Sequence, residues 1–213
     1  MDREQDAFAL LSDEVLQYEV LRRVLDDAVP PENLWQAARL ARVCKRFEAL
    51  VWPCVHTLCA TTQMENAALA KLSHLKTLEL GRNKLISDAG LAHVPLLTTL
   101  KLGENETISD AGLAHVPRLT TLDLGRNETI SDAGLAHVPL LTTLLLSWKS
   151  NDISDAGIAH VPQLTTLDLG GNNTISNAGL TYVPRLTELK LGENKTIGGA
   201  KVAQLKHLRI VKK

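Results

Sequence analysis

Aromatic residues are scarce in this chain: two Phe, two Tyr and three Trp make up 3% of its 213 residues. Five of the seven lie before residue 53, and only Trp148 and Tyr182 lie after it. This change in composition predicts a domain boundary near Trp52 and Pro53.

An excess of charge is also missing. The chain has 23 Lys and Arg residues against 24 Asp and Glu residues, a formal net charge of -1. This balance argues against a nucleic-acid or anionic-membrane partner held by bulk electrostatics.

Cysteine is limited to Cys44, Cys54 and Cys59. Their odd number and their lack of metal-ligand spacing predict free thiols in a reducing compartment.

Long apolar runs and catalytic motifs are absent from the sequence as well. No run approaches the roughly 18 residues that cross a membrane, and the first residues, MDREQDAFAL, are acidic where a secretory signal needs basic groups. We therefore expect a soluble intracellular protein, cytoplasmic or nuclear. We also expect no enzyme activity and no cofactor, because no phosphate-binding loop and no nucleophile with an associated His and carboxylate can be identified.

The sequence is dominated instead by one unit of 22 or 23 residues that occurs six times. The third copy reads LTTLDLGRNETISDAGLAHVPL, and the copies begin at Leu75, Leu97, Leu119, Leu141, Leu164 and Leu186. A fixed period in this range is typical of a solenoid, in which each unit buries its apolar face against its neighbours.

Each unit contains a strand pattern, a turn and a helix pattern. Leu-x-x-Leu-x-Leu places alternate apolar side chains on one face of a short strand. In the segment Ile-Ser-Asp-Ala-Gly-Leu-Ala-His-Val-Pro we expect a short helix that has Ser as its N-cap and is stopped by Pro. An Asn at the turn is expected to satisfy buried backbone groups of the stack, and these residues form a predicted structural ladder: Asn83, Asn105, Asn127, Asn172 and Asn194.

This repeated block resembles leucine-rich repeats of the variety with a helical convex side. The resemblance implies an α/β solenoid, a curved horseshoe with parallel strands on the concave side and short helices on the convex side. We assign the repeats to residues 54–213. They comprise a degenerate initial repeat at 55–74, six regular repeats at 75–207 and a terminal half-repeat at 208–213.

The segment before the repeats shows two helical patterns. Apolar residues recur three to five apart from Phe8 to Ala28, Pro30 and Pro31 end that pattern, and a second one runs from Glu32 to Trp52. We divide the segment into an N-terminal helical extension, residues 1–14, and a small all-α domain, residues 15–53. So small a bundle would be marginal alone, which predicts that it packs on the solenoid or on another protein.

The all-α domain resembles the F-box. LQYEVLRRVL from Leu16, PPENL from Pro30 and ARVCKRF from Ala41 follow the order and spacing of that family's pattern. An F-box followed by leucine-rich repeats is the layout of substrate receptors in SCF (cullin-RING) ubiquitin ligases. The resemblance implies contacts with the Skp-family adaptor, and through it with a cullin, by Leu16, Val20, Leu21, Val24, Leu25, Leu34, Val43 and Cys44. Several of these residues could equally form the core of the bundle, and ARVCKRF could be an amphipathic helix that caps the first repeat.

Two columns of residues are expected to line the concave face. One column contains Glu79, Lys101, Asp123, Leu145, Asp168 and Lys190, and the other contains Arg82, Glu104, Arg126, Trp148, Gly171 and Glu193. Charges of alternating sign should pair within each column. The fourth repeat breaks both columns with apolar residues and lengthens its loop by one residue.

This break predicts a protein-binding site formed by Asp123, Arg126, Leu145, Trp148 and Asp168, because an exposed Trp beside an exposed Leu is typical of a binding hot spot. Alternatively, Trp148 folds over its own irregular loop and fills the gap left by the missing Asn.

A row of histidines, His93, His115, His137 and His160, could suggest a metal site. A straight ladder does not converge ligands on one ion, so we expect helix-end histidines and no metal.

Two functional hypotheses remain. The chain is either the substrate-recognition adaptor of an SCF ubiquitin ligase, whose repeats bind a protein substrate, or a free-standing protein-binding scaffold or inhibitor.

Overall fold

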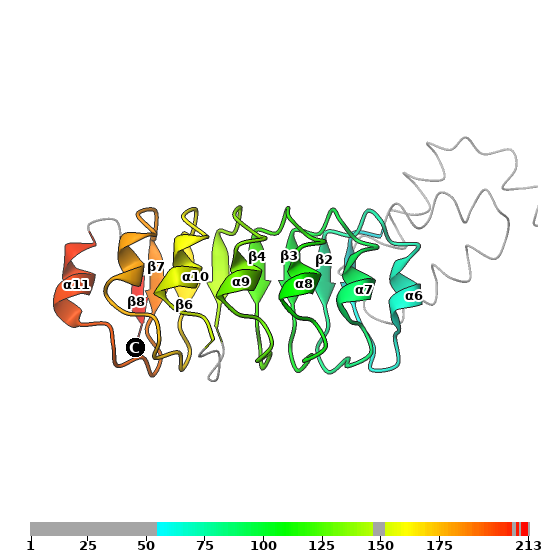
Figure 1. Cartoon of the computed structure of the whole chain (residues 1–213), viewed down its shortest axis with the longest axis horizontal. Helices are drawn as coiled ribbons and strands as arrows, with labels where there is room; N and C mark the ends of the chain where they lie inside the picture. The colour runs from blue at the N-terminus through cyan, green and yellow to red at the C-terminus, as the bar shows by residue number, and fades with distance from the viewer. Residues whose placement is uncertain (1–54, 147–151, 206–207, 209, 213) are drawn as a thin grey trace, which may run out of the picture.

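The computed structural model describes residues 55–146, 152–205, 208 and 210–212. These residues form one elongated stack with strands along one side and short helices along the other (Figure 1). The strands are β1 (Thr57–Cys59), β2 (Thr77–Glu79), β3 (Thr99–Lys101), β4 (Thr121–Asp123), β5 (Thr143–Leu145), β6 (Thr166–Asp168), β7 (Glu188–Lys190) and β8 (Ile210–Lys212). The helices are α6 (Asn66–Leu69), α7 (Asp88–Leu91), α8 (Asp110–Leu113), α9 (Asp132–Leu135), α10 (Asp155–Ala159), the 3₁₀ helix η3 (Gly179–Thr181) and α11 (Gly199–Gln204).

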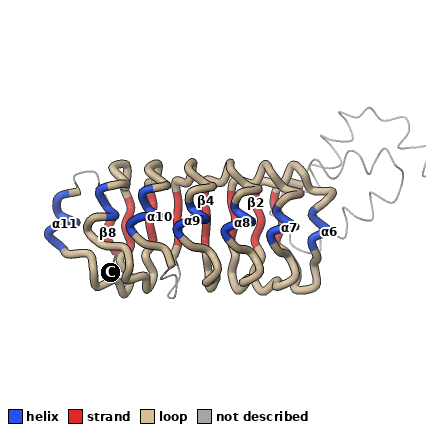
Figure 2. The backbone as a smooth tube through the Cα atoms, viewed as in Figure 1, coloured by secondary structure: helices blue, strands red, loops and turns tan. Residues whose placement is uncertain are grey.

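The eight strands form one parallel sheet in sequential order. Each strand pairs with the equivalent residues of the next repeat, so that Leu100 lies beside Leu122 and Leu122 beside Leu144. The chain therefore advances by one repeat per strand, and every helix lies opposite its own strand (Figure 2). This arrangement is the solenoid of parallel strands and short helices that the repeat period predicts.

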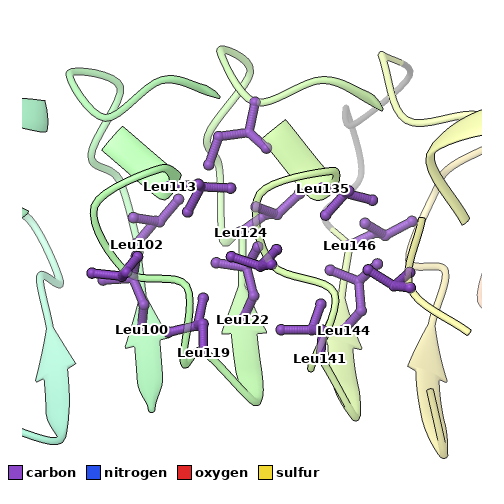
Figure 3. Close-up of a cluster of buried hydrophobic side chains, with 14 of the residues drawn as sticks. Leu100, Leu102, Leu113, Leu119, Leu122, Leu124, Leu135, Leu141, Leu144 and Leu146 are labelled. Carbon is purple, nitrogen blue, oxygen red and sulfur yellow. The ribbon is translucent and has the colours of Figure 1, made fainter. Parts of the chain in front are cut away.

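The core is a continuous ribbon of aliphatic side chains between the sheet and the helices. Each regular repeat contributes the same set, for example Leu119, Leu122, Leu124, Ile130 and Leu135, all at most 1% exposed. Figure 3 shows how the side chains of three successive repeats fill the space between strands and helices. Full burial of one such side chain contributes about 1.5–3 kcal/mol, and no repeat can bury its own set without its neighbours.

In most repeats the turn after the strand requires a glycine, because its backbone has a positive φ angle. Gly81, Gly103, Gly125, Gly170 and Gly192 have φ between +53° and +62°, a backbone conformation that other L-residues rarely adopt. The repeats also approach closely at this point. A Cβ atom on Gly125 would lie 2.3 Å from the carbonyl oxygen of Gly103.

In four repeats the helix is tied to the previous repeat by a carboxylate. Asp110 Oδ1 accepts a hydrogen bond from the Ser131 backbone N–H at 2.8 Å, and its Oδ2 accepts one from the Ser131 hydroxyl at 2.6 Å. Ser131 Oγ in turn caps α9 by accepting from the Ala133 N–H at 3.2 Å. Gly134 makes room for this contact, since a Cβ there would lie 2.3 Å from Asp110 Oδ1. We call this arrangement the Asp–Ser clamp. It recurs between Asp88 and Ser109, Asp132 and Ser154, and Asp155 and Ser176.

One detail of the helix prediction is wrong. The helix α7 ends at Leu91, four positions before Pro95, because the next N–H groups bond to carbonyls only three residues back, as His93 N does to Gly90 O at 3.1 Å. The proline therefore does not stop the helix. In the fifth regular repeat the helix is the 3₁₀ turn η3, where both the N–H and the hydroxyl of Thr181 donate to the Ala178 carbonyl.

Candidate protein-binding surface

The outward side of the sheet exposes two rows of side chains, which together we call the strand face. The middle residue of each strand from β1 to β7 is a buried Leu, and the residues on either side of it point outward. The first row contains Thr77, Thr99, Thr121, Thr143, Thr166 and Glu188, and the second contains Glu79, Lys101, Asp123, Leu145, Asp168 and Lys190.

Two ion pairs lie within the second row. Lys101 Nζ is 2.6 Å from Glu79 Oε1, and Lys190 Nζ is 3.3 Å from Asp168 Oδ2. The hydrogen bond that Lys101 donates to Glu79 is the main reason why the pKa of Lys101 is raised, and the charges of Glu79 and Asp123 raise it further. The predicted pairing of alternating charges is therefore present in this row.

Asp123 and Leu145 differ from the rest of the row. Asp123 forms no ion pair with a described residue, and its Oδ1 accepts a hydrogen bond from the Gly125 N–H at 2.9 Å. Leu145 is half-buried. In the sheet it lies beside Asp123 of β4 on one side and beside Asp168 of β6 on the other. An aliphatic side chain thus lies between two carboxylates on a surface where every other member of the row is charged.

A third row of side chains lies at the turns after the strands. Glu104 Oε1 lies 3.8 Å from Arg82 Nε and 3.4 Å from Arg126 Nη1, so one carboxylate bridges two guanidinium groups. Both arginines are more than three-quarters exposed. Exposed pairs of this kind contribute little to stability and remain available to a partner.

Cys59 extends the second row into the initial repeat. Its thiol donates to Glu79 Oε2 at 3.7 Å. Burial raises the pKa of this thiol, and the neighbouring Glu79 carboxylate raises it further. The sulfur is therefore held in its protonated, weakly nucleophilic form.

The turn asparagines lie inside the stack, away from the strand face. Asn83, Asn105, Asn127 and Asn172 are at most 1% exposed, whereas Asn194 is partly exposed. Asn127 Nδ2 donates to the carbonyls of Asn105 and Ile108 in the previous repeat, and its Oδ1 accepts from the N–H groups of Thr129 and Ile130. These contacts serve the backbone of the solenoid and leave no polar group for a ligand.

The histidine row lies on the helix side of the stack, where His93, His115, His137 and His160 are all exposed. Within the part of the chain that the structure describes, no group of three His, Cys, Asp or Glu side chains is arranged to hold a metal ion. Among the same residues, no helix has the length and apolar character needed to cross a bilayer.

Several predicted site residues lie outside the described residues. Trp148 is one of them, so the two alternatives for its side chain stay predictions. The same holds for the N-terminal extension, for the F-box-like domain, and for all eight predicted adaptor contacts: Leu16, Val20, Leu21, Val24, Leu25, Leu34, Val43 and Cys44.

Sequence reasoning missed the role of the repeated threonine pair. The first Thr of each pair links repeats, as Thr120 Oγ1 does by donating to the Thr98 carbonyl at 3.0 Å. The second Thr points outward and builds the first row of the strand face. The signal was available, because a Thr-Thr pair recurs before the central Leu in four of the six units.

The comparisons with known proteins agree with this geometry. The family model described as Leucine Rich repeat matches residues 71–92, 95–114, 117–136 and 162–183. No F-box domain is detected. Among curated proteins, none matches the chain significantly.

The solved structures that are similar to the chain in fold include internalin C2 and the Toll–Spatzle complex. Internalin C2 from Listeria monocytogenes is 27% identical with a TM-score of 0.61, and the match covers 78% of this chain and 74% of that one. The structure of the Toll–Spatzle complex from Drosophila is 16% identical with a TM-score of 0.56, and the match covers 74% of this chain but only 22% of that one. The repeated units of this chain are therefore leucine-rich repeats, stacked into a solenoid of parallel strands and short helices.

Proposed function

We propose that the repeat array is a protein-binding scaffold that holds its partner against the strand face. The observation that supports this most strongly is the break at Leu145. Its row is otherwise made of charges, most of which pair with one another, and a half-buried aliphatic side chain between two carboxylates has no evident role in the stack. A surface of this kind offers an apolar contact at its centre and charged contacts around it.

The proposed site consists of Asp123, Arg126, Leu145, Trp148 and Asp168. Because Leu145 is already half-buried, covering it contributes about 1 kcal/mol, which corresponds to roughly five-fold in affinity. Replacing Leu145 by Asp places a third carboxylate between those of Asp123 and Asp168. A partner would then have to desolvate that added charge. The substitution should therefore weaken binding by far more than five-fold.

The test is affinity capture of partners from source cells by the parent chain and three variants. Leu145→Asp should lose the partners that the parent chain retains. Leu140→Asp is the control for the same substitution, because Leu140 is a surface Leu, 52% exposed, that lies outside the strand face. Retention of the same partners by Leu145→Asp, with the fold intact by circular dichroism, would contradict the proposed site.

Trp148→Ala separates the two alternatives for that residue: loss of partners at an unchanged melting temperature supports a binding role, and lower stability alone supports a filling role.

We further propose that the scaffold is the substrate-recognition adaptor of an SCF-type ubiquitin ligase. The order of an F-box-like pattern followed at once by leucine-rich repeats supports this proposal. The helices of residues 15–53 would dock on the Skp-family adaptor and so on a cullin, while the repeats hold a protein substrate. The chain itself would be non-catalytic and intracellular, and it would act by raising the local concentration of substrate lysines near the ubiquitin-charged enzyme.

Binding to a purified Skp-family adaptor distinguishes this role from that of a free-standing scaffold or inhibitor. Micromolar or tighter binding that Val20→Asp abolishes supports the ligase role, because a charge in the docking helix cannot be buried without a partner. Leu145→Asp should bind the adaptor normally and serves as the control. Absence of adaptor binding at micromolar concentration leaves the scaffold as the function.

A further inference from the structure

We infer that the strand face recognises a second copy of this chain, packed antiparallel about a two-fold axis that runs along the strands between β4 and β5. The inference rests on the proposed role of the strand face in protein binding and names one partner for it. In this arrangement each row of one copy faces the same row of the other copy in reverse order. Strand β2 then faces β7 of the second copy, β3 faces β6, and β4 faces β5.

The second row of the strand face is complementary to its own reverse. Glu79 on β2 meets Lys190 on β7, and Lys101 on β3 meets Asp168 on β6. The two-fold axis repeats both contacts, so four opposite-charge contacts form and no like charges meet. At the centre Asp123 meets Leu145 of the second copy, and the two Leu145 side chains lie on either side of the axis.

The other two rows are compatible with the same arrangement. In the turn row Arg82 faces Glu193, and Glu104 faces Gly171, neither of which brings like charges together. In the first row hydroxyl faces hydroxyl at the inner strands, as Thr99 faces Thr166 and Thr121 faces Thr143, and at the outer strands Thr77 faces Glu188. A single two-fold axis therefore brings no like charges together at the described positions of the three rows.

The ion pairs within each copy strengthen this match. The Glu79–Lys101 pair of one copy lies over the Lys190–Asp168 pair of the other, so four charges of alternating sign form a square. The spacing also agrees without adjustment, because strands in both copies are about 4.8 Å apart. A second copy is a partner whose side-chain period equals that of the strand face by construction.

The predicted association is a weak, closed dimer. The contact is isologous, which limits assembly to two copies. Six three-residue strands present much less than the roughly 800 Å² per partner of a standard interface, so we expect dissociation in the range of tens of micromolar. Because charges dominate the contact, dimerisation should weaken at least ten-fold between about 0.05 M and 0.5 M salt.

Charge-swap variants separate this contact from the ion pairs inside one copy. Lys101→Glu places a carboxylate opposite Asp168 of the second copy, twice per dimer, and should weaken dimerisation at least ten-fold. Adding Asp168→Lys restores opposite charges at this contact, and Glu79 still faces Lys190. The double variant nevertheless keeps like charges side by side within each copy, at positions 79 and 101 and at positions 168 and 190. Recovery of dimerisation by the double variant therefore cannot come from repaired pairs within one copy.

The measurement is sedimentation equilibrium of the full chain at up to about 200 µM, well above the expected dissociation constant, and at low salt. Lys84→Glu, the same charge change at an exposed position outside the strand face, is the control and should dimerise like the parent chain. The inference is overturned if the parent chain is monomeric under these conditions, if Lys84→Glu weakens dimerisation as much as Lys101→Glu does, or if the double variant is as weak as the single one. Partner capture that depends on Leu145 would survive each of these outcomes, so the scaffold proposal stands or falls separately.

Discussion

Replacing Asn127 by Ala should cost far more stability than the same replacement at Asn194. Both side chains make the same contacts: Nδ2 donates to two carbonyls of the previous repeat, and Oδ1 accepts from two N–H groups further along the chain. They differ in burial, since Asn127 is 1% exposed and Asn194 is partly exposed. The pair therefore isolates the effect of water access.

The expected magnitude follows from the groups that lose their partners. Without the Asn127 side chain, the Asn105 carbonyl and the Ile130 N–H have no other described partner in a dry interior. Each buried unsatisfied group costs about 1–3 kcal/mol, which gives roughly 2–6 kcal/mol in total. At Asn194 water can replace the lost bonds, so the cost should be about 1 kcal/mol.

Urea unfolding followed by circular dichroism measures both free energies of unfolding. For a chain of this size the Asn127→Ala variant should also melt about 4–20 °C lower than the parent chain. Equal losses of stability in the two variants would show that burial of the turn amide is not what stabilises the stack.

Two further predictions concern the contacts between repeats. Gly134→Ala should lower the free energy of unfolding by about 1–3 kcal/mol, because its Cβ displaces the Asp110 carboxylate from the Asp–Ser clamp. Asp110→Ala in the same chain should relieve part of that loss, and strictly additive effects in the double-mutant cycle would contradict this reason. Stability should also fall as pH rises above about 9, since the folded pKa values of Cys59 and Lys101 are both raised and such groups stabilise only below their folded pKa. Glu79→Gln should flatten this alkaline slope in urea midpoints measured from about pH 8 to 10.5, and an unchanged slope would exclude the contacts of Glu79 with these two groups as its cause.

The sequence predicted those features of the fold that repeat within one unit. The Leu spacing located the strands, as Leu122 and Leu124 illustrate: both are buried, and Asp123 between them points outward. The sequence also predicted which charges pair, because alternation of sign between units needs only the order of the strands.

Contacts between units were harder to predict. In the Asp–Ser clamp, Asp110 bonds Ser131, which lies 21 residues later in the next unit, whereas the sequence predicted only that each Ser caps the helix of its own unit. Because the units are nearly identical, the sequence does not show which unit contributes the Ser that each Asp contacts. Helix length was misjudged for a related reason. The close packing of Gly90 against Asn66 of the previous repeat helps to set the geometry of the helix, and a single unit does not contain that neighbour.

Carboxylate footprinting on a captured partner complex tests most directly whether the strand face is the binding surface. Carbodiimide labelling followed by mass spectrometry compares each carboxylate in the free and bound chain at sub-micromolar concentration. Binding should reduce the labelling of Asp123 and Asp168 several-fold and leave the exposed Glu106, outside the strand face, unchanged. Protection of Glu106 with Asp123 and Asp168 still fully labelled would place the partner elsewhere and contradict the account.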